Sequence, residues 1–419
     1  MRTVSKTVIG VDFGTQSARA VLVNAENGEI IYSCRKEYPY NSTPVPAIDC
    51  AENLPCATDY EMTLYELLRN VIPEEYRKTV AGICVDATSL TMVLLAEDGR
   101  ALSELDGWSE AAHARVKLWK YHRAQEKADE ALNLARNLQE PFLGRTGGSI
   151  SCEWMLPKLL EVRDEAPEIY SKIDLAMDLC EFLTFRLTGQ LVRSIGSLSY
   201  KCLWAEDLSF PERTFLNGLR AGFYEEYCHF LRGDVRKPGE CAGMLRSELT
   251  KRWGLPEQIP VATGMLDGHT SLATMGAFEP GDAALIVGTS NVCTVQDRKL
   301  QELKDVCGVA QDGMVTGSCG IDTGQSSTGN MLGWFVEHMA GWQIHREAEE
   351  RKISPHQVLA ERIQKPWENK VIAVDWWSGS RNAPCDLTLR GSMSGLEMDT
   401  KTEDIYLALL QAIACGTGT

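Results

Sequence analysis

The sequence lacks the segments that are typical of membrane proteins and of nucleic-acid-binding proteins. No uninterrupted apolar run reaches the length of about 18 residues that could span a bilayer, and the first ten residues, MRTVSKTVIG, do not contain the apolar segment of a signal peptide. No run of Lys and Arg offsets a formal net charge of -16. Because such a charge repels phosphate backbones and anionic lipids, we expect no nucleic-acid partner and no membrane partner.

The sequence also lacks the cysteine and histidine spacings that are typical of metal sites and of redox-active cysteine pairs. The 14 cysteines are scattered as single residues, without a C-x-x-C pair or a Cys/His cluster. We interpret them as reduced core thiols of a cytoplasmic protein. The polar stretch 111–140 is predicted to be a long helix, in which His113 and His122 do not share a face. These two histidines are therefore interpreted as solvated or capping residues rather than metal ligands.

The remaining composition is that of an ordinary globular protein. With 419 residues, 44% of them hydrophobic and 24% charged, the chain is long enough for two or three domains and a large core. An acidic surface does not exclude a nucleotide ligand, because backbone N–H groups and a divalent cation can hold phosphate.

The stretch 8–23, VIGVDFGTQSARAVLV, predicts a β-hairpin in which two apolar strands are joined by a short turn. Gly14 lets an anion approach consecutive backbone N–H groups, so that the turn of Gly14, Thr15 and Gln16 is a candidate phosphate cradle. Asp12 stands at its mouth, where a carboxylate could hold hydrated Mg²⁺. Taken alone, the same pattern also fits a plain hairpin.

A second copy of this pattern strengthens the interpretation as a phosphate site. Residues 283–295 read AALIVGTSNVCTV, and Gly288, Thr289 and Ser290 correspond to the turn of the first hairpin. One hairpin in each half of the chain predicts two similarly folded lobes that hold a polyphosphate between them.

Single residues after predicted strands and helices are candidates for a substrate site. Ser89 follows a buried strand at 80–87, where ligands gather in open α/β sheets, although small polar residues there also form turns. Lys201 lies in an apolar context, and such lysines either reach the surface or serve a site. Asp267 begins a predicted helix, as an N-cap or as the base that phosphoryl transfer to an alcohol requires. Asp322, in a segment rich in Gly, Ser and Thr, could bind a polyol.

Eight segments in the same order give the chain a resemblance to the FGGY carbohydrate kinases and, among them, to ribulokinase-like members. They are GVDFGTQSARA, VDATSLTM, HARVKLWKYH, YKCLW, LDGH, GTSN, GIDTGQS and DWWSGSR. The resemblance implies an α/β fold with two ribonuclease-H-like (actin-like ATPase) lobes around a hinged cleft. It also implies ATP, Mg²⁺ and transfer of the γ-phosphoryl group to the terminal hydroxyl of a ketopentose, with ribulose as the leading substrate.

The same resemblance assigns roles to individual residues. Asp267 matches the catalytic base, while Lys201, Asp322 and Ser89 match positions beside the sugar. Asp322 stands where Glu is usual and Ser89 where Ala is usual, so the identity of the ketose stays open. Gly14, Thr15, Gln16, Gly288, Thr289 and Ser290 are expected at the phosphates, and Asp12 at Mg²⁺.

The resemblance also predicts how the chain is divided. We expect residues 1–257 to form the N-terminal lobe, which binds sugar and phosphate, and residues 258–419 to form a C-terminal lobe for nucleotide and base. Because family members continue beyond the equivalent of residue 414, we expect the second lobe to be incomplete. Two alternatives remain, an actin- or chaperone-type ATPase and a catalytically impaired sugar-binding protein. The sequence leaves a homodimer open.

Overall fold

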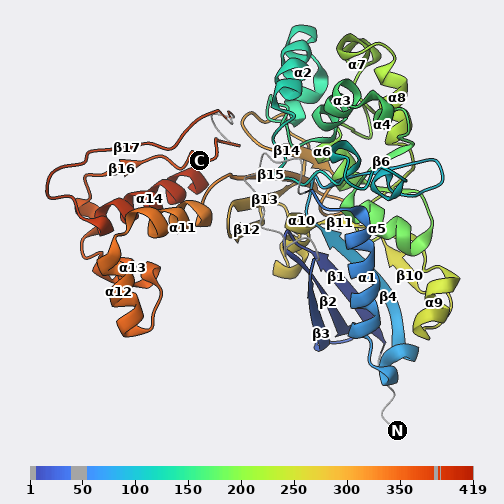
Figure 1. Ribbon diagram of the computed structural model, residues 1–419, viewed down its shortest axis with the longest axis horizontal. Helices are drawn as coiled ribbons and strands as arrows, with labels where there is room; N and C mark the ends of the chain where they lie inside the picture. The colour runs from blue at the N-terminus through green and yellow to red at the C-terminus, as the bar shows by residue number, and fades with distance from the viewer. Residues whose placement is uncertain (1–5, 39–53, 382–385, 387, 419) are drawn as a thin grey trace.

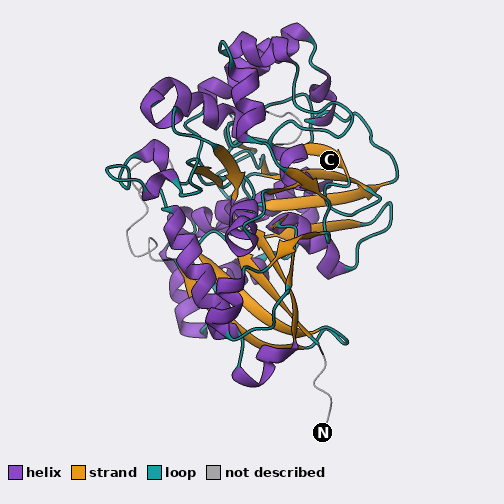
Figure 2. Ribbon diagram, turned by 90° about the vertical axis from the view of Figure 1, so that its right-hand side faces the viewer, coloured by secondary structure: helices purple, strands orange, loops and turns teal. Residues whose placement is uncertain are grey.

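The computed structural model describes residues 6–38, 54–381, 386 and 388–418. Its α/β chain is built around two main sheets, one near the N-terminus and one in the second half (Figure 1). Figure 2 shows strands through the lower and middle parts of the molecule and helices around them.

The first sheet has the strand order β3-β2-β1-β4-β10-β9, and β11 pairs with the end of β4. Strands β1, β2 and β3 form an antiparallel meander, whereas β4 runs parallel to β1 and both β10 and β11 run parallel to β4. The strands are β1 (Thr7–Phe13), β2 (Ser17–Asn24), β3 (Ile30–Glu37), β4 (Val80–Ala87), β9 (Cys241–Met244), β10 (Pro260–Ala262) and β11 (Met265–Leu266). In β1, Ile9, Val11 and Phe13 face the core, so Asp12 points to the other face.

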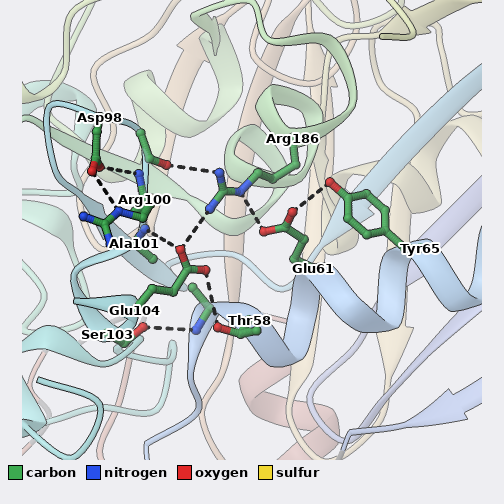
Figure 3. Close-up of polar contacts among 11 residues, drawn as sticks. Thr58, Glu61, Tyr65, Asp98, Arg100, Ala101, Ser103, Glu104 and Arg186 are labelled. Carbon is green, nitrogen blue, oxygen red and sulfur yellow. Dashed lines mark hydrogen bonds and ion pairs between the residues drawn. The ribbon is translucent and has the colours of Figure 1, made fainter. Parts of the chain in front are cut away.

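Helices α1 (Ala57–Val71) and α5 (Leu179–Thr188) pack against the first sheet. Their buried leucines join the core of the sheet. Arg186 of α5 ties these elements together through ion pairs with Glu61 of α1, at 2.9 Å, and Glu104, at 3.5 Å (Figure 3). This network serves the packing of the first lobe.

A mostly helical region extends from the first sheet and has a hydrophobic cluster of its own. Its larger helices appear at the top right of Figure 1. The region contains β5 (Met92–Leu95), α2 (Gln125–Leu138), α3 (Met155–Glu165), α4 (Pro167–Tyr170), β6 (Leu175–Asp178), β7 (Val192–Ser194), α6 (Ile195–Lys201), α7 (Arg213–Leu219), α8 (Phe223–Phe230) and β8 (Asp234–Arg236). Short 3₁₀ helices among the described residues of the first half are η3 (Glu74–Thr79), η4 (Leu102–Glu104), η5 (Ala112–Ala114) and η6 (Pro141–Arg145), and α9 (Ser247–Trp253) precedes β10.

The second sheet is antiparallel, with the order β12-β13-β15-β14. It consists of β12 (Ala283–Val287), β13 (Asn291–Asp297), β14 (Gly308–Gln311) and β15 (Cys319–Gln325). Helix α10 (Asp267–Met275) connects the two sheets: it follows β11 directly and contacts both β12 and β13.

The last part of the chain forms a helical group with a separate cluster of buried residues, on the left of Figure 1. It contains α11 (Gly329–Met339), α12 (Trp342–Arg351), α13 (Pro355–Arg362), η7 (Pro366–Glu368), the strand pair β16 (Ile372–Ala373) and β17 (Met393–Ser394), and α14 (Thr402–Gly418).

Both predicted hairpins are confirmed, as β1–β2 and β12–β13. The single helix predicted for 111–140 is wrong, because only α2 (Gln125–Leu138) is an extended helix there. Ahead of it, Lys117 forms an antiparallel bridge with Met92, with N···O distances of 2.9 and 3.1 Å. The backbone at Lys117 is therefore held beside β5, and its side chain is fully buried.

The sequence of residues 166–187 also predicts one continuous helix that ends at Gly189, and the continuity is wrong because the strand β6 interrupts it. All four residues of β6 are buried and pair with β5. A short apolar run without periodicity does not distinguish a buried strand from a buried helix. The predicted helix end at Gly189 is confirmed, where the backbone turns left-handed at φ 71°.

Three further expectations concern the whole chain. No helix among the described residues is long and apolar enough to cross a membrane. The cysteines that the structure describes are free thiols, but Cys241 and Cys415 are exposed and do not belong to a core. The boundary between residues 257 and 258 stays a prediction, and β10 and β11, which follow it, still pair within the first sheet.

Candidate active site

Three carboxylates converge where strands of the first sheet end. Asp12 in β1 lies in register with Asp86 in the parallel strand β4. Asp267 follows β11, whose two residues pair with Asp86 and Ala87. Because the carboxyl ends of parallel strands meet at one edge of a sheet, the fold brings three acidic side chains into one neighbourhood.

Asp86 carries the clearest electrostatic signature of this group. Burial, and next the charges of Asp12 and Asp267, raise its pKa to about 8. Its Oδ1 is buried and has no hydrogen-bond partner among the described residues. An orphaned carboxylate oxygen beside Asp12 fits a divalent cation, since Mg²⁺ binds one or two carboxylates together with water and substrate phosphates. Within the described ranges, no three His, Cys, Asp or Glu side chains form a complete metal cage.

Asp267 occupies the first position of α10, at the junction of the two sheets. Its Oδ1 accepts a hydrogen bond of 2.7 Å from the N–H of Gly268. Gly268 itself abuts the second sheet, because a Cβ at this position would lie 3.5 Å from Val292. Burial, and then the charge of Asp12, raise the pKa of Asp267 to about 6, while the N–H groups of Gly268 and Ser89 oppose the shift. A carboxylate that titrates near neutral pH is suited to accept a proton.

A buried cluster of charged side chains stands beside this carboxylate. Lys201, the last residue of α6, donates to Asp322 of β15 at 3.0 Å. His269 Nε2 lies 3.6 Å from the same oxygen, Oδ2. Although burial alone would raise it, Lys201 and His269 hold the pKa of Asp322 well below its ordinary value. Lys201 is buried and paired, which excludes the alternative that it extends to the surface.

Two further buried polar atoms in this neighbourhood have no hydrogen-bond partner among the described residues. They are Oγ of Ser89 and Nδ1 of His269. The backbone N–H of Ser89 hydrogen-bonds the carboxylate of Asp267, and His269 is two positions further along α10. Since native proteins satisfy nearly all buried polar groups, such atoms indicate a place for a polar ligand or water.

The first hairpin turn is fixed by contacts to neighbouring loops. The carbonyl of Gly14 accepts a 2.8 Å hydrogen bond from the hydroxyl of Tyr38. Thr15 Oγ1 accepts one of 3.1 Å from Trp119 Nε1, and the carbonyl of Gln16 accepts one of 3.4 Å from the N–H of Tyr38. The side chain of Trp119 therefore links the turn to the HARVKLWKYH segment.

The second hairpin turn docks on the start of α11. The Gly288 carbonyl accepts hydrogen bonds of 3.0 Å from the Gly329 N–H and from Thr328 Oγ1. The Thr289 carbonyl accepts from the N–H groups of Thr328, at 3.2 Å, and Asn330, at 3.3 Å. Gly288 and Thr289 are exposed and Ser290 is half-buried. The carbonyls point into the protein, which leaves the tip of the turn at the surface.

One ion pair joins the C-terminal part of the chain to the first lobe. Arg381 forms a 2.7 Å ion pair with Glu153, and its guanidinium lies 5.8 Å from the ring centre of Trp119. His122 approaches the same carboxylate at 3.0 Å. Against the effect of burial, the two basic groups lower the pKa of Glu153 to about 2. His122 is therefore a partner of Glu153 rather than a solvated residue. His113 likewise pairs with Glu165, at 3.2 Å.

Comparisons with known proteins agree with this architecture. The structure of a ligand-bound xylulose kinase from Lactobacillus acidophilus superimposes with a TM-score of 0.76 at 18% identity, covering 98% of this chain and 77% of that one. A glycerol kinase from Plasmodium falciparum with ADP gives a TM-score of 0.75 at 16% identity, covering 99% and 77%. The chain therefore has the two-lobed, actin-like ATPase fold of these sugar kinases.

Sequence comparisons give the family. The model of the FGGY family of carbohydrate kinases, N-terminal domain, matches residues 7–274, and the model of the C-terminal domain matches residues 283–418. This chain belongs to the FGGY family of carbohydrate kinases and is an ATP-dependent sugar kinase. The expectation of an incomplete second lobe is not supported by these matches.

Curated relatives named ribulokinase match nearly the whole chain. The relative from Halalkalibacterium halodurans is 34% identical over 423 residues, which cover 99% of this chain and 75% of the relative. The relative from Mycolicibacterium smegmatis is 36% identical over 428 residues, which cover 98% and 75%.

Of the residues singled out from the sequence, the structure brings Asp12, Asp267, Ser89, Lys201 and Asp322 into one region. It places the two hairpin turns in different sheets, as expected. Sequence reasoning gave no role to other members of the site, although all of them except Glu153 lie in the segments that carry the family resemblance. They are Asp86, Trp119, Glu153, His269 and Arg381. Asp86 carried a readable signal, because it ends a buried strand directly before Ser89. The pairing of Glu153 with Arg381 had none.

Proposed function

We propose that this kinase transfers the γ-phosphoryl group of ATP to the terminal hydroxyl of a ketopentose, with ribulose as its substrate. The ribulokinase names of the curated relatives support the choice of sugar. The observation that carries the proposal is the position of Asp267, whose pKa is raised to about 6 beside the buried Lys201–Asp322 pair. A base beside buried groups that can hydrogen-bond a hydroxyl is what transfer to a hydroxyl requires.

In this scheme Asp267 accepts the proton of the attacking hydroxyl. Lys201 and Asp322 bind hydroxyl groups of the sugar as a donor and an acceptor, and the free Oγ of Ser89 offers a further contact. His269, through Nδ1, is an added candidate for the same task. Their near-complete burial favours the sugar over water as the acceptor, because the sugar can satisfy several polar groups at once.

The hairpin turns serve the phosphates. We assign Gly14, Thr15 and Gln16 to one side of the polyphosphate and Gly288, Thr289 and Ser290 to the other. Asp12, together with Asp86, would hold Mg²⁺, which neutralises phosphate charge when bound. The unpartnered Oδ1 of Asp86 supports this assignment.

Several coarser expectations accompany the proposal. A lobe boundary between residues 257 and 258, a cytoplasmic location, the absence of a nucleic-acid partner and a homodimer stay predictions. An ATPase of the actin or chaperone type is less favoured, because such an enzyme does not need the buried Lys201–Asp322 pair. A sugar-binding protein without activity is less favoured, because Asp267 retains the environment of a base.

The test is ADP formation from Mg-ATP with L-ribulose, D-ribulose, xylulose and glycerol offered separately. We expect ADP formation that depends on one of the ribuloses, with the phosphate found on the terminal carbon by NMR. ADP formation that is independent of any sugar would favour the ATPase. Sugar binding, measured by calorimetry, without ADP formation would favour the inactive binding protein.

A further inference from the structure

Leu90 adopts an unusual backbone conformation at the edge of the candidate site. Its φ is 62°, in the left-handed region that branched residues rarely occupy. It directly follows Ser89, whose N–H hydrogen-bonds Asp267. A strained residue persists only where surrounding contacts fix it.

Two buried charged side chains supply those contacts, one on each side of the Leu90 backbone. The N–H of Leu90 donates to Asp178 Oδ2 at 3.0 Å, and its carbonyl accepts from Lys158 Nζ at 2.6 Å. Lys158 and Asp178 are both fully buried, on α3 and at the end of β6. Asp178 is itself held by the N–H of Leu179, at 2.8 Å.

The ammonium group of Lys158 also reaches a second segment. It donates to the carbonyl of Leu118 at 3.0 Å and to that of Lys117 at 3.4 Å. Leu118 precedes Trp119, which donates to Thr15 in the first hairpin turn. One buried cation therefore joins the backbone beside the base to the segment that fixes the phosphate turn.

A purely structural role explains Lys158 poorly, whereas Asp178 also caps the N-terminus of α5. Lys158 forms no ion pair with any residue in the described part of the chain, and only backbone carbonyls satisfy its charge. Burying this amine without an ion-pair partner is costly, since burial lowers the pKa of Lys158 to about 7, and apolar side chains usually fill such a position at lower cost. The cost of burying Lys158 is offset only if the conformation that it gives the Leu90 turn is needed for function.

We propose that Lys158 and Asp178 are positioning residues, which hold the strained Ser89–Leu90 turn so that the Ser89 N–H is aimed at the carboxylate of Asp267. This inference rests on the proposed role of Asp267 as the base. Neither residue touches the reacting atoms. Their effect on the reaction passes through one backbone hydrogen bond and through the orientation of the Ser89 side chain.

The test uses Lys158→Met and Asp178→Asn, each followed by the pH profile of kcat/KM for the sugar. Loss of an N–H donor to a carboxylate raises its pKa, so we expect the acidic midpoint to move upward by about one pH unit or less in both variants. Burial raises the pKa of Asp178 to about 7, so near pH 6 this side chain is mostly uncharged, and Asp178→Asn would leave the midpoint unchanged if charge alone acted. An upward shift of the acidic midpoint in both variants therefore indicates that the Ser89–Leu90 turn has been displaced.

Arg186→Met is the matched control, since it removes a largely buried cation of the same lobe, which Figure 3 shows in a separate network. We expect a lower melting temperature with an unchanged midpoint. Hydrogen exchange of the peptide around residues 88–92 should accelerate in Lys158→Met and not in Arg186→Met. If Lys158→Met fails to fold, the pH profile of the nearly isosteric variant Asp178→Asn tests the proposal by itself.

Unchanged midpoints in the folded variants, or midpoints that move in opposite directions, would overturn the proposal while leaving the kinase function intact. A failure of the proposed function looks different. In that case the unaltered protein itself would show no sugar-dependent ADP formation, or Asp267→Asn would leave its pH profile unchanged.

Discussion

Arg381 and Glu153 stand 228 positions apart in the sequence, and their side chains form an ion pair of 2.7 Å. Arg381 follows β16 in the C-terminal part of the chain, whereas Glu153 precedes α3 in the first lobe. The pair therefore connects the C-terminal part of the chain to the first lobe beside Trp119. The indole N–H of Trp119 in turn donates a hydrogen bond to Thr15 in the first hairpin turn.

Arg381→Met should destabilise the protein, because it leaves the buried carboxylate of Glu153 with His122 as its remaining side-chain partner. Removing one partner of a buried pair costs on the order of 3 kcal/mol, which chemical denaturation would detect. Arg346→Met is the control, because the exposed pair of Arg346 with Glu350 is worth about 0.5 kcal/mol or less. Equal losses in the two variants would mean that the Arg381 pair contributes no more than a surface pair.

Gly329→Ala should weaken the binding of ATP. A Cβ at Gly329 would meet the carbonyl oxygen of Gly288 at 2.5 Å, so the second hairpin turn has to move. We expect the KM for ATP to rise by about tenfold, the equivalent of 1.4 kcal/mol, with little change in the KM for the sugar.

Gly333→Ala provides the comparison for that experiment, on the same helix. Its Cβ would meet no heavy atom within 4 Å, and alanine favours helix formation by about 1 kcal/mol. It should leave both KM values unchanged and stabilise the protein slightly. If Gly329→Ala behaved in the same way, the second turn would have no part in binding the nucleotide.

The rate should depend on pH through Asp267. Its pKa is raised to about 6, and only the deprotonated carboxylate can accept a proton. We therefore expect kcat/KM to be constant above that pH and to fall about tenfold for each pH unit below it. A profile without this decline down to pH 5 would contradict the assignment.

Lys201→Met should act on the sugar and not on the nucleotide. It removes a donor and leaves Asp322 with His269 alone. Losing a charged hydrogen bond to the substrate raises the KM for the sugar by about 10- to 100-fold. Lys237→Met is the matched control, because Lys237 pairs with Asp312 at 2.7 Å in another part of the fold. A similar KM for the sugar in both variants would remove Lys201 from the sugar site.

Local patterns explain which parts of the fold could be predicted. The hairpins 8–23 and 283–295 combine alternating apolar residues with a glycine turn, so both follow from short segments. The same reasoning failed for the segment around Lys117, since a lysine normally indicates a solvent-exposed position and this one is fully buried. Its environment depends on β5, which lies more than 20 positions earlier in the sequence.

The site residues also fall into two groups, those that short sequence patterns mark and those that only long-range contacts bring together. Asp12, Ser89 and Asp267 stand at strand or helix ends that the sequence marks, and the resemblance to sugar kinases supplied their roles. The contact of Lys201 with Asp322 spans 121 positions, and that of Arg381 with Glu153 is longer still. Such pairs depend on how the two lobes meet, which no local pattern encodes.

The most direct measurement is the turnover of Asp267→Asn with Mg-ATP and the preferred ketopentose, alongside sugar binding by calorimetry. Asparagine keeps the size of the side chain and the hydrogen bond from Gly268, but it cannot accept the proton. We expect kcat to fall by about 100-fold or more while the Kd for the sugar changes less than about threefold. A variant that binds the sugar and turns over within about threefold of the unaltered protein would contradict the role of Asp267 as the base.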